Sequence, residues 1–142
     1  MRALLDVNVL IALLDAAHIH HQRASQWLEQ SLHHGWASCP LTQIGCLRIM
    51  AQPAYPQALP LAAVAQRLGQ AAATPAHLFI ADDYSLLDAD SLHWPQLLGH
   101  RQVTDAYLLG LAVRHGCRFV SFDARVNLAA VPGAKAEHLW VL

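Results

Sequence analysis

The segment from Val103 to Asp123 most limits the folds that this chain can adopt. It combines apolar residues at helical spacing with Gly116 and a short apolar run over Arg118–Phe122, and it ends on an acid. Gly116 is predicted to take the left-handed conformation that ends many helices. The run after it is short enough for a buried strand. A helix followed directly by a buried strand is typical of an α/β protein with a parallel sheet.

The rest of the chain repeats this alternation of short strands and helices. We predict strands over 3–5, 35–39, 77–80, 118–122 and 138–141, and helices over 7–14, 19–32, 40–51, 61–73 and 105–115. Asn8 and Thr104 are the expected N-caps of the first and last of these helices. Residues 86–98 are ambiguous, and we interpret them as one broken helix. The pattern predicts an α/β fold with helices on both faces of a parallel sheet.

Composition indicates one folded domain, which we assign to residues 1–142. Hydrophobic residues make up 55% of the chain and charged residues 13%. This balance excludes a disordered protein and leaves apolar surface for a partner. The formal net charge is −1, so any recognition of phosphate must depend on a few local side chains.

The cysteines and the N-terminus indicate a cytoplasmic protein. Cys39, Cys46 and Cys117 are odd in number and lie in apolar surroundings, which is typical of buried, reduced thiols. The apolar run at the N-terminus is interrupted by Asp6, so we expect neither a signal peptide nor a membrane span.

Three acids are expected to meet at one edge of the sheet. Asp6 follows the first strand, Asp123 ends the strand over 118–122, and Asp105 lies in the first turn of the helix that leads into that strand. Carboxyl ends of parallel strands and N-termini of the following helices share an edge, where ligands usually bind. Each acid alone has a structural explanation, as a turn residue or as a favourable charge at a helix start. Together they predict a carboxylate site for Mg²⁺ or Mn²⁺.

Other polar clusters carry less weight. His18 and His21 are spaced to reach one metal from a helix face, but a solvated helix surface is the favoured interpretation. A second group of acids crowds an irregular polar stretch that we predict to be a solvated loop, namely Asp82, Asp83, Asp88 and Asp90.

Three segments of the chain carry a specific resemblance. They read LLDVNVLIALLD over 4–15, CPLTQIGCLRIM over 39–50 and VTDAYLLGLAVRHGCRFVSFD over 103–123. In order and spacing they resemble the three signature blocks of VapC-type toxins, which are PIN-domain ribonucleases of VapBC toxin-antitoxin systems. The similarity extends from the N-terminus to about Asn127, and 53–101 is its least diagnostic part.

The resemblance implies a PIN-like fold with about five parallel strands. It also implies an endoribonuclease in which Asp6, Asp105 and Asp123 hold Mg²⁺ or Mn²⁺, and the metal activates water for attack on an RNA phosphodiester. A VapB-type antitoxin and a homodimer are the implied protein partners. We expect the apolar surface that includes Trp27, Leu28 and the helix from Leu61 to be covered by them.

Gln43 departs from the family pattern. The second block usually supplies a Glu at this place, so Gln43 joins the three acids as a candidate catalytic residue without adding charge. One metal is therefore the safer expectation.

Four further residues are predicted to support the site or to have structural roles. Asn8 and Thr104 are expected mainly to cap helices, although either could also orient a group in the site. Ser121 lies two residues before Asp123 on the same strand face and could contact a metal ligand. Arg48 matches an Arg in the second block, and an RNA phosphate and an internal ion pair are equal alternatives for its partner.

Two alternative functions remain open at this point. Asp6-Val7-Asn8 is similar to the nucleophile loop of aspartate-dependent phosphatases, but that chemistry needs an acid where Asn8 stands and a well-placed Lys. Lys135, the only lysine, lies near the C-terminus. The second alternative is a non-catalytic PIN module that only binds RNA or an antitoxin, which Gln43 makes plausible.

Overall fold

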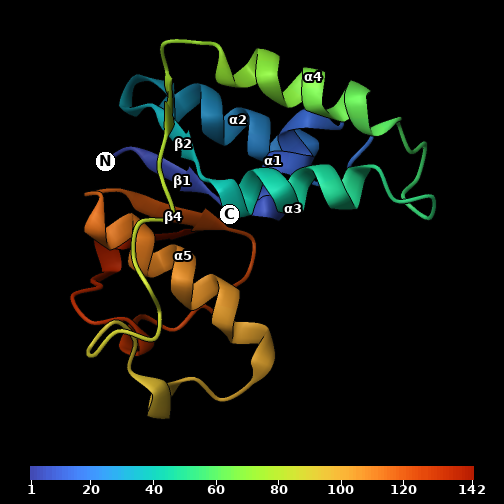
Figure 1. The fold of residues 1–142 in the computed structure, drawn as a ribbon. Coiled ribbons are helices and arrows are strands. Elements are labelled where there is room, and N and C mark those ends of the chain that lie inside the picture. The colour runs from blue at the N-terminus through green and yellow to red at the C-terminus, as the bar shows by residue number, and fades with distance from the viewer.

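The sheet has five parallel strands, as the alternating pattern predicts. The computed structural model describes residues 1–142 (Figure 1). In chain order its elements are β1 (Ala3–Leu5), α1 (Val7–Leu14), α2 (His21–Ser31), β2 (Trp36–Ser38), α3 (Pro40–Met50), α4 (Leu61–Ala72), β3 (His77–Phe79), α5 (Val103–Arg114), β4 (Arg118–Ser121) and β5 (Leu139–Val141). The strand order is β3-β2-β1-β4-β5, and all four pairings are parallel. The predicted fold class is confirmed.

Strand β1 occupies the centre of the sheet, and the order in which strands are added reverses there. From β1 the strands progress through β2 to β3 on one side, whereas β4 and β5 lie on the other side. The pairing of Leu5 with Val120 holds the carboxyl ends of β1 and β4 side by side. Ligands of open α/β proteins bind at such a switch point. Asp6 and Asp123 follow the two strands that flank it.

Two apolar layers cover the sheet and fix its position. Helices α1 to α4 lie on one face and α5 on the other (Figure 1). Alternate residues of each strand enter the two layers: Leu4 and Phe119 pack with α5, whereas Leu5 and Val120 pack with α1 to α4. Full burial of one such side chain contributes roughly 1.5–3 kcal/mol. The strands that end at the acidic edge are therefore held in place by packing on both faces of the sheet.

Both predicted N-caps are wrong. Asp6 itself caps α1, because its carboxylate accepts a hydrogen bond from the Val7 amide at 2.7 Å and the helix starts directly after the strand. Asn8 is an exposed residue inside that helix. A short 3₁₀ turn over His100–Gln102 runs straight into α5, which begins at Val103, so Thr104 also lies within its helix. Gly116 has the predicted left-handed φ, +62°.

Residues 86–98 do not form a helix. They run as turns with one 3₁₀ turn at Trp94–Gln96. Asp90 has a φ of +62°, which no right-handed helix accommodates, and Pro95 would lack the amide hydrogen that a helix interior uses.

The apolar residues expected to meet partners differ in position. Trp27 is 9% exposed and packs in the same apolar layer as Val9 of α1, so it belongs to the protein's own core. Leu61 is 58% exposed at the start of α4. No helix of the fold has both the length and the apolar character needed to cross a membrane.

Two helical glycines provide a matched test of this packing. A Cβ at Gly110 of α5 would overlap the Tyr84 hydroxyl and lie 3.2 Å from Tyr84 Cζ, whereas a Cβ at Gly69 of α4 would meet nothing. Tyr84 cannot move freely, because its hydroxyl donates to the Tyr107 carbonyl at 2.7 Å and the two rings stack. We expect Gly110→Ala to lower the free energy of unfolding by about 1–3 kcal/mol. Gly69→Ala should raise it by about 0.5–1 kcal/mol, as Ala is the better helix former.

Urea denaturation of both variants measures these changes. Equal effects of the two substitutions would contradict the tight contact between Tyr84 and α5.

Candidate active site

Asp6 is the most rigidly held of the three predicted acids. It is 8% exposed. One carboxylate oxygen accepts from the Val7 amide at 2.7 Å, and the other accepts from the Ser121 hydroxyl at 2.7 Å. Burial raises the pKa of the Asp6 carboxyl against the lowering effect of these two donors, and the charge of Asp123 raises it further. Each Asp6 oxygen still has a lone pair without a protein donor.

Ser121 links the acids of the two central strands. Its hydroxyl donates to Asp6 and accepts from the backbone amide of Asp123 at 3.0 Å. Ser121 is fully buried, so both bonds are shielded from water. The sequence hypothesis that Ser121 contacts a candidate ligand agrees with this geometry, and its role is to fix Asp6 relative to the end of β4.

Asp105 faces the other two acids from the first turn of α5. Its carboxylate receives no hydrogen bond from the protein, although the residue is half-buried. Burial, followed by the charges of Asp6 and Asp123, raises its pKa to about 6. Asp105 is thus the carboxyl whose ionisation the surroundings oppose most, and a nearby cation would favour its charged form.

Asp123 is paired with Arg125 in the turn after β4. The guanidinium donates from Nε to one carboxylate oxygen and from Nη2 to the other, both at 3.0 Å. The Arg125 backbone amide adds a third bond at 2.8 Å. These contacts hold the pKa of Asp123 below its usual value.

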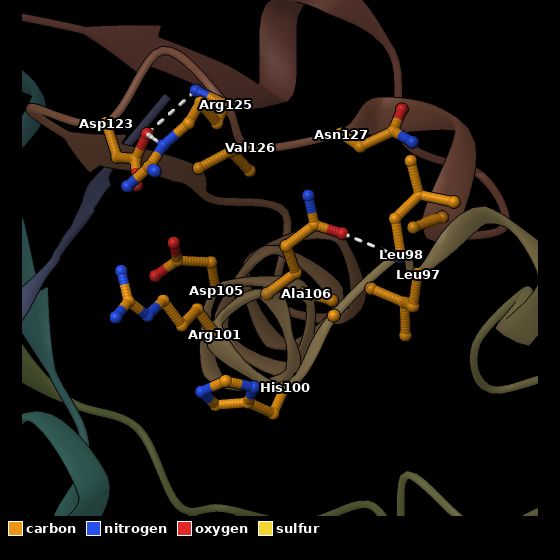
Figure 2. A pocket seen from close by; sticks show the side chains of 13 residues that line it. Leu97, Leu98, His100, Arg101, Asp105, Ala106, Asp123, Arg125, Val126 and Asn127 are labelled. Carbon is orange, nitrogen blue, oxygen red and sulfur yellow. Dashed lines mark hydrogen bonds and ion pairs between the residues drawn. The ribbon is translucent and has the colours of Figure 1, made fainter.

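A pocket of about 230 Å³ opens between the turn after β4 and the start of α5. Asp105 and Asp123 lie on its walls with Arg101 and Arg125, and Figure 2 shows these four side chains directed toward a common space. Arg101 and Arg125 were not identified from the sequence. The signal was present for Arg125, since an Arg two residues after a strand-end acid can fold back on it in a tight turn.

Gln43 contacts a different part of the sheet edge. Its amide nitrogen donates to the Ser38 hydroxyl at 3.1 Å, and Ser38 in turn bonds His77 Nε2 at 2.8 Å. Gln43 makes no hydrogen bond to any of the three acids and does not line the pocket.

The donor set of the three acids fits a hard divalent cation. As the side chains stand, no group of three or more His, Cys, Asp or Glu residues is close enough to hold one metal ion, and both Asp123 oxygens accept from Arg125. However, Asp105 has no protein donor and Asp6 keeps spare lone pairs. Carboxylate oxygens that repel one another at the edge of a pocket are the ligands Mg²⁺ and Mn²⁺ select.

The remaining sequence candidates have structural or surface roles. His21 bonds the Ala12 carbonyl through Nδ1, and neither it nor His18 belongs to a group of three side chains that could hold a metal ion. Arg48 is exposed and forms no ion pair, so the internal alternative for this residue is wrong. The three cysteines are buried and free, as predicted.

The loop acids have specific partners. Asp82 accepts a hydrogen bond from the Leu41 amide, and Asp83 pairs with His115 at 3.0 Å. Both acids are exposed, which confirms the predicted solvated stretch.

The parallel sheet, its switch point and the acids at that edge define an α/β domain with an acidic site, and the family model described as "PIN domain" matches residues 3–133. The chain therefore belongs to the PIN-domain family, as its signature blocks suggested. It is 48% identical over 142 residues to Ribonuclease VapC44 of Mycobacterium tuberculosis (strain ATCC 25618 / H37Rv), with 100% of each chain covered.

Other relatives agree. The chain is 47% identical over 143 residues to Ribonuclease VapC38 of the same strain, with 99% of each chain covered. It is 40% identical over 135 residues to Ribonuclease VapC39, covering 94% of this chain and 96% of the relative. The phosphatase alternative finds no support among these relatives, whose names all describe ribonucleases.

The raised pKa of Asp105 predicts how the metal-free protein responds to pH. The pKa is about 6 in the folded protein against an ordinary value of 3.8, so folding favours the protonated carboxyl. The resulting stabilisation is complete below about pH 4 and is lost as the pH rises through 6. Asp105→Asn cannot ionise, so its stability relative to the parent should rise by on the order of 1 kcal/mol between pH 4 and pH 7, allowing for solvent screening.

Urea unfolding in the presence of a chelator, at four pH values over this interval, measures the difference. Asp88→Asn, in the exposed loop, is the matched control and should follow the parent. Parallel pH profiles for the parent and Asp105→Asn would show that neither burial nor the other acids raise the pKa of Asp105.

Proposed function

We propose that this protein is an endoribonuclease that hydrolyses RNA phosphodiester bonds with a divalent metal held by Asp6, Asp105 and Asp123. The observation that carries the proposal is the junction at Ser121, which joins Asp6 to the end of β4 while Asp105 faces both acids without a donor of its own. The similarity to proteins named ribonucleases supports the same activity.

In this proposal each acid has a distinct task. Asp6 is the fixed ligand, since two hydrogen bonds hold its orientation. Asp105 and Asp123 supply charge from the walls of the pocket that would receive the scissile phosphate. A bound Mg²⁺ or Mn²⁺ would lower the pKa of water and offset the negative charge of the phosphate.

Arginine, rather than a broad basic face, would recognise the RNA backbone. Arg101 is exposed at the pocket and has no carboxylate partner, which leaves its planar guanidinium available to bond phosphate oxygens. The net charge of −1 is consistent with a few local contacts to a single-stranded region.

Apolar surface supports the proposal of protein partners. A groove of about 670 Å³ lies between α1, α2 and α4, and Leu13, Leu28 and Leu68 are among its mostly hydrophobic lining. A VapB-type antitoxin and a second copy of the chain are the partners we propose for the apolar surface, in a cytoplasmic toxin-antitoxin pair.

The acids provide the direct test. We expect Asp6→Asn, Asp105→Asn and Asp123→Asn each to reduce metal-dependent RNA cleavage by more than about 100-fold, beyond the loss typical of residues that only support a ligand. Cleavage of a fluorogenic RNA with Mg²⁺ or Mn²⁺ measures the loss, and circular dichroism shows whether each variant is folded.

Asp88→Asn is the control and should cleave at the parent rate. Parent-level cleavage by any of the three site variants would remove that residue from the ligand set. A parent protein that binds RNA but never cleaves it would favour the non-catalytic PIN module.

Gln43→Glu tests whether position 43 belongs to the site. If it does, the added carboxylate should tighten Mn²⁺ binding by on the order of 1 kcal/mol, which calorimetry resolves at fixed pH. The gain should disappear when Asp6→Asn is added. Unchanged affinity in a folded Gln43→Glu variant would assign Gln43 only to the structural network with Ser38 and His77.

A further inference from the structure

Arg125 occupies the place that a cation would take at Asp123. Three hydrogen bonds connect the two residues, and the guanidinium spans both carboxylate oxygens. One oxygen accepts both from the Arg125 amide and from Nε, so its two lone pairs are used. The other accepts only from Nη2, and no other protein group competes for it.

Coordination of a metal by Asp123 therefore requires that one hydrogen bond to Arg125 be broken. A ligand bond through the second oxygen needs Nη2 to move, while the turn formed by the Arg125 amide can stay intact. The side chain of Arg125 is 76% exposed, so little packing opposes this movement. A divalent cation would also repel a guanidinium held this close.

The displaced guanidinium remains in the pocket. Arg125 lines the same walls as Arg101, Asp105 and Asp123 (Figure 2). The planar fork that matches a carboxylate also matches a phosphate. A phosphate that binds next to the metal could thus accept the hydrogen bonds that Arg125 no longer donates to Asp123.

We propose that Arg125 is an exchangeable counter-ion: it neutralises Asp123 in the metal-free protein, is displaced when a divalent cation binds, and then contacts the RNA phosphate. This inference rests on the proposed metal-dependent ribonuclease function. It makes Arg125 a substrate-binding residue that competes with the metal, so that metal binding and phosphate binding are coupled through one side chain.

Metal binding without RNA is the primary test. Arg125→Gln removes the charge and the fork, and Arg23→Gln, an exposed Arg on α2 across the sheet, is the matched control for net charge. We expect calorimetry to show Mn²⁺ binding about fivefold tighter in Arg125→Gln, and unchanged in Arg23→Gln. In an Asp123→Asn background, Arg125→Gln should have a much smaller effect, because the competing pair no longer exists.

Two further measurements follow Arg125 itself. In the parent protein, the Nε–H resonance of Arg125 should shift when Mg²⁺ is added, which reports its release from Asp123. In RNA cleavage at saturating metal, Arg125→Gln should raise KM about tenfold or more with a smaller change in kcat, and Arg125→Lys should lie between it and the parent.

The outcomes separate this inference from the function on which it rests. Equal Mn²⁺ affinity of the parent and Arg125→Gln, with RNA cleavage intact, would overturn the exchange and leave the ribonuclease proposal standing. Tighter metal binding with an unchanged KM would overturn the phosphate contact. Absence of Mn²⁺ binding in both proteins would overturn the metal dependence and the inference together.

Discussion

Electrostatic repulsion among three carboxylates is the main constraint on the site edge of this structure. Asp6, Asp105 and Asp123 come from three different elements, and burial together with the charges of Asp6 and Asp123 raises the pKa of Asp105 to about 6. Two apolar layers and five paired strands stabilise the fold and hold the acids close together, so no attraction between the acids is needed. Local polar contacts then reduce it: Ser121 and the start of α1 satisfy Asp6, and Arg125 neutralises Asp123. Only Asp105 is left without a donor, which makes it the acid most dependent on an external cation.

The elements and the site edge could be predicted because they depend on periodic burial. The strands Ala3–Leu5 and Arg118–Ser121 are short, mostly buried runs with an acid shortly after each, and each lies within a few residues of a helix: α1 follows the first and α5 precedes the second. In a parallel sheet this is enough to bring Asp6 and Asp123 to one edge. The convergence of the three acids was accordingly foreseen without coordinates, whereas their role as ligands remains a proposal.

What the sequence did not reveal depends on individual hydrogen bonds. Asn8 and Thr104 are good capping residue types, but the helices start earlier because Asp6 caps α1 and a 3₁₀ turn leads into α5. The path of 86–98 is set by single residues such as Asp90 with its positive φ, which no periodicity encodes. The spacing of Asp123 and Arg125 permits their contact, but residue types alone do not show which way an exposed side chain folds.

The hydrogen bond between Ser121 and Asp6 joins residues 115 positions apart in the chain. It exists only when β4 has been inserted next to β1, and β4 is the fourth of five strands to be synthesised. During translation, the first strands and helices emerge long before the segment that completes the site. Closing a contact of such long range costs more chain entropy than closing a local one. A nascent or truncated chain ending before β4 would thus carry Asp6 without its positioning partner, so the acidic edge stays incomplete until the C-terminal part of the chain has been made.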